Sequence, residues 1–234
     1  MAIRTLLSRV DVPSALAALQ TKQVNFALGS PAHFTPERGW HVDDFTQPLP
    51  SEPPGEPAEH GSWQIARRLA RNYDFAEPSI VTAYFNPEHP LERRNMLLQL
   101  RFYGLRLWVG VRVGDVYDEV RRIDERSARV SGWNYRTLDG HVEQGQMDWQ
   151  VWKWLDDGTV EFRIHAFSRA TKRGNPLVRA GFRLIGRREQ LRFLRQTCRR
   201  MERLTAGTLG VPVADTPESR EAQVSFDVRP AERG

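Results

Sequence analysis

Residues 132–169 read GWNYRTLDGHVEQGQMDWQVWKWLDDGTVEFRIHAFSR, and this stretch decides the fold that we expect. Apolar and aromatic residues alternate with polar ones along it, which is typical of strands with one buried face. The alternation is interrupted at Asp139-Gly140 and at Asp157-Gly158. Because Asp-Gly favours a two-residue hairpin turn, the stretch predicts three consecutive antiparallel strands.

Two-residue turns would fix the pairing of these strands. The first turn sets Arg136 opposite Glu143, and the second sets Lys153 opposite Phe162. Because successive side chains point to opposite faces, one face then collects Val130, Met147, Trp149, Val151, Leu155, Val160, Phe162, Ile164 and Ala166. The same face ends in a polar rim of Asn134, Arg136, His141 and Glu143. We expect this face to point inward, with its rim at the mouth of a cavity.

The opposite face is amphipathic. It carries Trp133, Tyr135, Gln144, Gln146, Asp148, Gln150, Trp152, Arg163 and His165. We therefore expect His165 at the surface rather than beside His141. Lys153 is the exception on the apolar face: either a bulge turns it outward, or it anchors an anionic head group inside the cavity.

Composition indicates one globular domain with tails. Of the 234 residues 40% are hydrophobic and 27% are charged, enough for a core, and no apolar run approaches the ~20 residues of a membrane span. The N-terminus lacks a secretory pattern, and a single cysteine, Cys198, excludes a disulfide framework, so we expect a cytoplasmic location. Of the 34 basic residues all but Lys22, Lys153 and Lys172 are arginine, which is more typical of a GC-rich genome than of nucleic-acid binding.

The other elements follow from local patterns. Residues 13–23 predict a helix, whereas residues 29–61, with seven prolines, should form no regular element and should wrap the surface. We expect a strand at 62–75, a short helix at 78–85 and further strands at 96–102, 105–113, 116–123 and 128–138. A long final helix carries an apolar stripe of Val178, Phe182, Ile185, Leu191, Leu194, Cys198, Met201 and Leu204. Its other side carries Arg179, Arg183, Arg187, Arg188, Arg192, Arg195, Arg199, Arg200 and Arg203.

This order predicts an α+β helix-grip fold. A curved antiparallel sheet of about six or seven strands should pack on the long C-terminal helix, with a cavity between them. We expect an N-terminal helix and Pro-rich wrapping segment at 1–61, the helix-grip domain at 62–205 and an extended or disordered tail at 206–234.

The runs GWNYRTLDGHVEQG (132–145) and HAFSR (165–169) resemble the domain-of-unknown-function family numbered nineteen-ninety. The resemblance covers roughly residues 62–205 and implies no activity. It departs at Gln146, where the family pattern leads us to expect a glutamate. The fold implied is similar to START-type, polyketide-cyclase-like and lipid-transfer helix-grip domains, and one fold hosts many functions.

His141 and Glu143 are the candidate catalytic residues. Two positions apart on one strand, they can serve as an acid/base pair or as two metal ligands at a pocket mouth. Against this, Glu143 can form a simple cross-strand ion pair with Arg136, and no third metal ligand is evident, so we expect neither a metal nor a cofactor. The expected ligand-binding residues are Asn134, Arg136, His141, Glu143, Trp149, Val151, Phe162 and Ile164.

Three functions remain open from the sequence. The first is binding of an apolar or amphipathic, lipid-like small molecule in the cavity, and the second is an enzyme acting on that ligand through His141 and Glu143. The third is peripheral binding of an anionic membrane or nucleic acid through the arginine-rich helix. The sequence leaves the oligomeric state undetermined.

Overall fold

A computed structural model describes residues 10–171 and 176–209, without the side chains of residues 31, 102, 105 and 176–185. The chain begins with α2 (Val12–Ala18), continued by a 3-10 turn at Leu19–Thr21, and 3-10 turns follow at Pro31–His33 and Pro36–Arg38. The next elements are β1 (His41–Leu49), α3 (Ser62–Asn72), β2 (Val81–Tyr84) and a 3-10 turn at Leu91–Arg93. The remaining elements are β3 (Asn95–Phe102), β4 (Leu105–Ile123), β5 (Arg126–Thr137), β6 (Glu143–Trp154), β7 (Val160–Ala170) and α4 (Pro176–Thr208).

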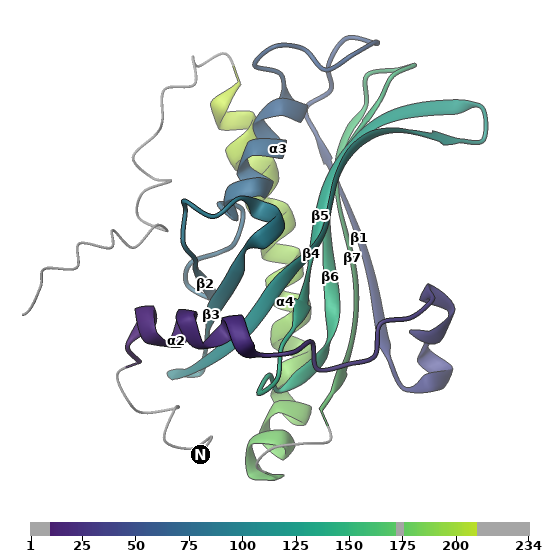
Figure 1. Cartoon of the computed structure of the whole chain (residues 1–234). Coiled ribbons are helices and arrows are strands. Elements are labelled where there is room, and N and C mark those ends of the chain that lie inside the picture. The colour runs from purple at the N-terminus through teal and green to yellow at the C-terminus, as the bar shows by residue number, and fades with distance from the viewer. Residues whose placement is uncertain (1–9, 172–175, 210–234) are drawn as a thin grey trace, which may run out of the picture.

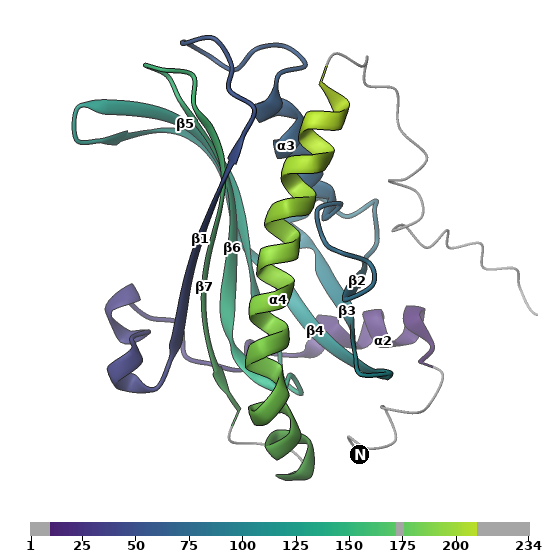
Figure 2. The same ribbon diagram turned by 180° about the vertical axis from the view of Figure 1, so that it is seen from behind.

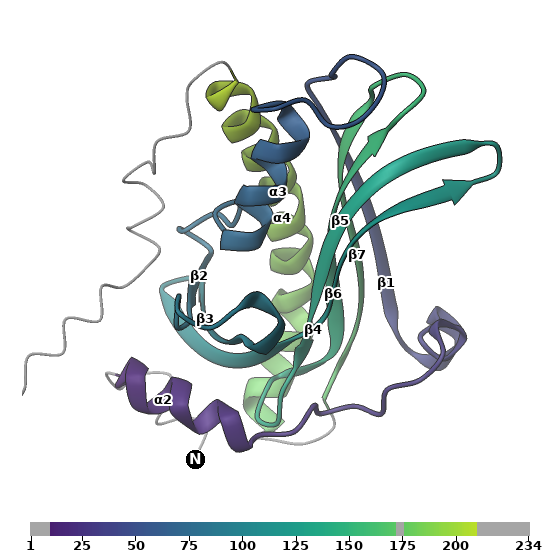
Figure 3. The same cartoon turned by 45° about the horizontal axis from the view of Figure 1, so that its top comes forward.

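The strands form one curved antiparallel sheet whose concave face holds α4. The order is β1-β7-β6-β5-β4-β3-β2, so β5, β6 and β7 lie next to one another as expected. Figures 1 and 2 show α4 running along the hollow of the sheet, with α3 beside its C-terminal half. Figure 3 shows the β4–β5 hairpin continuing past the body of the sheet as an arm. The predicted α+β helix-grip is confirmed, with seven strands.

Helix α2 also confirms its prediction. Asp11 precedes the helix and its carboxylate accepts a hydrogen bond from the Ser14 backbone N–H, while Pro13 occupies the first turn. Leu19 then packs with Leu97 and Leu138 on the convex side of the sheet.

Two predicted elements are wrong and exchange their types. Residues 62–75, expected as a strand, contain helix α3 (Ser62–Asn72), because its apolar residues recur with helical spacing and bury one face (Trp63, Ile65, Ala66, Leu69 and Ala70). Residues 78–85, expected as a helix, contain strand β2, in which Val81 and Ala83 alternate with more exposed neighbours.

The Pro-rich segment is also more regular than predicted. Residues 41–49 form β1, which pairs with β7 at the sheet edge. Pro48 is accommodated there because an edge strand hydrogen-bonds to a neighbour on one side only. Further upstream, Phe26, Phe34 and Trp40 pack on Phe167 on the convex face of the sheet.

The predicted register of the first hairpin is wrong. The Asp139-Gly140 turn does form, since the His141 N–H donates to the Leu138 carbonyl oxygen at 3.0 Å and Gly140 has φ +91°. The strands, however, pair Arg136 with Gln146 rather than with Glu143, because His141 and Val142 lie outside the ladder.

The partner of Arg136 is shifted by an odd number of residues, from Glu143 to Gln146, and an odd shift exchanges the two faces of β5. Trp133 and Tyr135 now pair with Trp149 and Met147 and belong to the main core. Their neighbours Asn134 and Arg136 consequently point to the convex face, the reverse of the expectation.

The second hairpin differs in register but keeps its faces. Val151 pairs with Phe162 rather than Ile164, an even shift, so the predicted inner residues of β6 and β7 stay inside. Lys153 also points inward and is fully buried, with no bulge to turn it out. Its Nζ donates to Glu52 Oε2 at 2.8 Å and to the Glu56 carbonyl oxygen at 2.9 Å.

In the part of the chain that the structure describes, none of the helices combines the length and the apolar character needed to cross a membrane.

Candidate functional site

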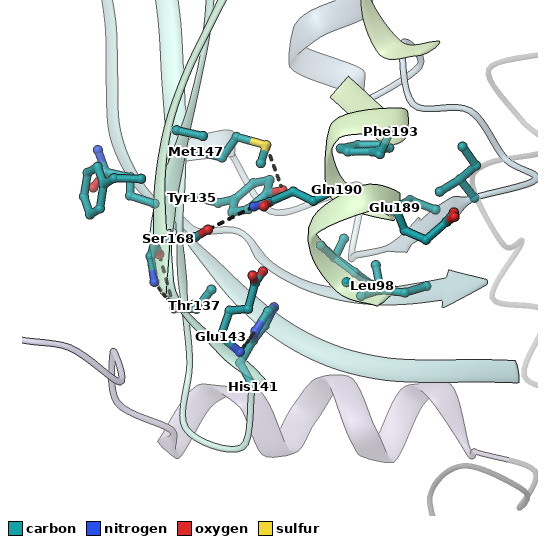
Figure 4. A pocket seen from close by; sticks show the side chains of 18 of the residues that line it. Leu98, Tyr135, Thr137, His141, Glu143, Met147, Ser168, Glu189, Gln190 and Phe193 are labelled. Atoms are coloured by element: carbon teal, nitrogen blue, oxygen red, sulfur yellow. Dashed lines mark hydrogen bonds between the residues drawn. The ribbon is translucent and has the colours of Figure 1, made fainter. Parts of the chain in front are cut away.

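A pocket of about 120 Å³ lies between the concave face of the sheet and α4, near the turn that joins β5 to β6 (Figure 4). Strands β2 and β3 supply one apolar wall, with Val81, Leu98 and Leu100, and Ile80 extends it from just before β2. The opposite wall comes from Tyr135, Met147 and Ala166 on β5, β6 and β7, and from Phe193 on α4. These positions follow from strand alternation, which sends every second side chain inward.

Glu143 is the polar group that enters this pocket most directly. It is the first residue of β6, and its carboxyl points into the space between Ser168 and α4 (Figure 4). Its backbone accepts a hydrogen bond from Asn25, but no group in the described residues donates to its carboxyl oxygens. Burial raises the pKa of Glu143 from 4.5 to about 7, opposed by nearby Arg187 and reinforced by Asp43.

His141 lines the same end of the pocket but is fixed by the backbone. Its Nδ1 accepts a hydrogen bond of 3.0 Å from the Glu143 N–H, so the ring proton of the neutral form lies on Nε2. The pKa of His141 is lowered from 6.5 to about 4, chiefly by burial and also by the charge of Lys22, against an opposing effect of the hydrogen bond with the Glu143 backbone. The imidazole is therefore neutral at physiological pH and holds the start of β6 in place.

Hydrogen bonds fasten α4 to the sheet beside the pocket. The Arg187 guanidinium donates to both carboxylate oxygens of Asp43 on β1, and to Gln190 Oε1 at 2.9 Å. Gln190 Nε2 in turn donates to the Ser168 hydroxyl of β7 at 3.0 Å (Figure 4). We call these four residues the α4 clasp.

Two tyrosines complete the polar part of the wall. The Tyr135 hydroxyl donates to the Met147 sulfur at 3.4 Å, a weak hydrogen bond. The Tyr73 hydroxyl is buried and has no hydrogen-bond partner in the described part of the chain. Burial raises the pKa of both phenols well above 10, so both remain neutral donors.

Of the eight predicted ligand-binding residues, His141 and Glu143 line the pocket. Trp149, Val151, Phe162 and Ile164 are at most 1% exposed and belong to the packed core instead. Asn134 and Arg136 lie on the convex face and interact with Asp115, so the expected ion pair between Arg136 and Glu143 does not form.

The sequence analysis missed the α4 side of the site. Gly186, Glu189, Gln190 and Phe193 line the pocket at helical spacing i, i+3, i+4 and i+7. The helical spacing is present in the sequence, but an apolar stripe alone does not include the polar members of this face. The expected stripe residues Val178, Phe182 and Ile185 lie outside the described side chains.

The arrangement suits recognition better than metal binding. In residues 10–171 and 176–209, no three His, Cys, Asp or Glu side chains lie close enough together to hold a metal ion. A carboxyl with a pKa near neutrality can bind a hydrogen-bonding group or exchange a proton with it.

The arginines of α4 whose side chains are described comprise two partly buried ones that contact other elements and a larger exposed group. Arg187 belongs to the α4 clasp, and Arg200 donates to the Asp74 carbonyl oxygen at 3.1 Å. The exposed ones are Arg188, Arg192, Arg195, Arg199 and Arg203. Arg179 and Arg183 lie outside the described side chains.

A protein-family model described as "Domain of unknown function (DUF1990)" matches residues 24–200. A comparison with curated proteins finds no match. Among solved structures, Ara h 8.0201 has a TM-score of 0.40 and 9% identity, over 72% of this chain and 99% of that chain. Norcoclaurine synthase of Thalictrum flavum has a TM-score of 0.47 and 7% identity, over 72% of this chain and 95% of that chain. Major latex-like protein 151 of Panax ginseng has a TM-score of 0.41 and 10% identity, over 70% of this chain and 96% of that chain. At these values the neighbours assign neither substrate nor activity.

Proposed function

The chain belongs to the DUF1990 family, and we propose that it binds a small, mostly apolar molecule with one polar group in the pocket under α4. The observation that carries this proposal is the Glu143 carboxyl, which enters an apolar pocket without a hydrogen-bond donor from the described chain. The apolar body of the ligand would lie against Leu98, Leu100 and Phe193, and its polar group would meet Glu143.

Energetics support this assignment. A fully buried polar group without a partner costs about 1–3 kcal/mol, and the partly buried Glu143 carboxyl bears a part of that cost. Lys153, a charged group inside the core, avoids this cost through its ion pair with Glu52. Uncompensated polar groups of this kind concentrate at functional sites, where they persist at the expense of stability.

Pocket size restricts the ligand. Sites for drug-sized molecules have volumes of roughly 300–1,000 Å³, whereas this pocket measures about 120 Å³. We therefore propose a ligand the size of a single substituted ring or a short chain rather than a whole lipid.

A second candidate is an enzyme that acts on the same ligand. The specific observation in its favour is the Glu143 pKa of about 7, which suits a general acid or base at neutral pH. His141 would be a positioning residue in this case, because its Nδ1 already accepts the Glu143 N–H.

Filling the pocket tests the proposed binding. Leu100 lines the pocket and is only partly buried, so Leu100→Trp should fill the space with little strain. Val120→Trp adds an aromatic ring at an exposed position of β4 and serves as the matched control. Saturation-transfer NMR with a library of single-ring compounds should detect binders to the wild type and to Val120→Trp.

The expected result is loss of those signals in Leu100→Trp, with urea unfolding confirming that the variant is folded. Equal binding by all three proteins, or no binder to the wild type, would contradict the proposal. Mass spectrometry of each bound compound after incubation would reveal turnover and so favour the enzyme.

A further inference from the structure

The charge balance of the pocket narrows the class of ligand. Among the charged side chains that line it, Glu189 is paired with Arg192 at 3.4 Å. Arg101 lines the pocket from β3, but its guanidinium donates to Gln99 and to the Pro78 carbonyl oxygen. Arg101 and Leu97 are four positions apart on β3, so their side chains share one face of the strand. Leu97 packs on the convex side, and the guanidinium of Arg101 therefore points away from the pocket.

Among the described residues that line the pocket, Glu143 is therefore the charged group that faces the interior without a counterion. Its surroundings are known from each element packed against it: Arg187 and Glu189 on α4, Asp43 on β1, His141 before β6, and the phenols of Tyr135 and Tyr73. The Arg187 charge is committed to Asp43, whose carboxylate it contacts with both Nη atoms. The two phenols are neutral, so none of these groups supplies a free positive charge.

Aromatic rings form the adjoining wall. The Tyr73 and Tyr135 rings both line the pocket, with centroids 6.4 Å apart, and Phe193 faces them from α4. Ring faces attract cations, by about 0.5–2 kcal/mol according to desolvation. A partly buried carboxyl beside several aromatic rings favours a positively charged partner over an anionic one.

We propose that the ligand of this pocket carries a protonated amine or another small organic cation, held by the Glu143 carboxylate and the neighbouring aromatic rings. This inference rests on the proposed binding function and names its ligand class. The apolar wall of β2 and β3 would receive the hydrocarbon part of the amine.

A matched pair of probes tests the ligand class. 2-Phenylethylamine and 2-phenylethanol have nearly the same shape and differ in charge, and an alkylamine stays protonated from pH 5 to 8. Calorimetry at pH 8 should give the amine about tenfold or greater preference, as expected for a hydrogen bond to a charged group. Below pH 7 its affinity should fall by about tenfold per pH unit, because the cation needs an ionised Glu143.

Variants identify the group responsible. Glu143→Gln should abolish both the preference for the amine and its pH dependence, while 2-phenylethanol binding changes little. Glu161→Gln, which alters a glutamate paired with Arg163 on the convex face of β7, should behave as wild type.

Failure of this inference is distinguishable from failure of the proposed function. Equal or tighter binding of the alcohol, or affinity for the amine that rises toward low pH, would overturn the cation while leaving pocket binding intact. Binding of other neutral ring compounds but of neither probe would do the same. No binding of any compound by the folded wild type would overturn both.

Discussion

At the scale of single residues, burial shifts the pKa values of the neighbouring groups Glu143 and His141 in opposite directions. Burial opposes ionisation of both, so it raises the pKa of the acid and lowers that of the base. At neutral pH the imidazole is uncharged while the carboxyl is near its midpoint. The sequence motif located this pair, but it could not reveal that Arg136 lies on the other face of the sheet.

Glu143→Gln should alter the pH dependence of stability. With a pKa raised from 4.5 to about 7, the folded state keeps a proton that the unfolded state releases, so Glu143 stabilises the fold at low pH and this contribution is lost as pH rises to 7. Urea unfolding should show the variant gaining about 2 kcal/mol relative to wild type between pH 5 and pH 8. Parallel pH profiles of the two proteins would contradict the burial of this carboxyl.

His141 should remain neutral far below the ordinary pKa of imidazole. Because its pKa falls from 6.5 to about 4, the unfolded state binds a proton that the folded state refuses, and stability decreases as pH falls through this window. Nitrogen-15 NMR at pH 6 should show that Nε2 of His141 is protonated and that Nδ1 is unprotonated. Imidazolium signals for His141 at pH 6 would refute this prediction.

At the scale of elements, the sequence predicted strands and turns better than their register. The chain reverses direction at both Asp-Gly sequences, but neither hairpin has the predicted two-residue loop. His141 and Val142 lengthen the first loop, and the resulting odd shift reverses a whole strand. Trp133 and Tyr135 therefore entered the core unpredicted. The helix at 62–72 was predicted as a strand, although its apolar residues Trp63, Ala66 and Ala70 recur with helical spacing.

Lys153 and Glu52 tie the loop after β1 to β6. Glu52 accepts from Lys153 Nζ, from the Trp63 N–H at the start of α3 and from the Ala58 N–H. Lys153→Met should cost about 3–5 kcal/mol, because it leaves a buried carboxylate without its cation. In urea unfolding, Lys153→Met combined with Glu52→Gln should recover part of this loss. Full additivity of the two changes would show that the pair is not coupled.

The α4 clasp should control how tightly α4 covers the pocket. Arg187→Met leaves the buried Asp43 unpaired and should lower the free energy of unfolding by about 2 kcal/mol, between the values for exposed and buried ion pairs. Hydrogen exchange around residues 186–193 should become faster. The neighbouring Arg188→Met, at an exposed position, should change stability by less than ~0.5 kcal/mol. Equal effects of the two substitutions would contradict the clasp.

At the scale of the whole molecule, the order of elements was enough to predict the helix-grip. A meandering sheet with one apolar face needs a single amphipathic helix to cover it. The position of the pocket could not be predicted in the same way, because it depends on which part of the concave face α3 and α4 leave unfilled. Trp149 and Phe162 were expected to line a cavity but pack beneath Phe75.

Charge is also distributed unevenly over the whole molecule. Helices α3 and α4 contain twelve arginines and two glutamates, a net +10, against +5 for the complete chain. The other elements and tails are therefore net negative. The positive charge thus belongs to the helix layer, whereas the pocket contains the negative charge of Glu143. Substitutions of helix arginines and of Glu143 can therefore test the two charges separately.

Intermolecular NOEs from 2-phenylethylamine to the protein at pH 8 test the central claim most directly. The account predicts contacts from the phenyl protons to the methyl groups of Ile80, Val81, Leu98 and Met147, lost in Leu100→Trp. Contacts confined to other surfaces, or none from a folded wild-type protein at saturating probe, would contradict it.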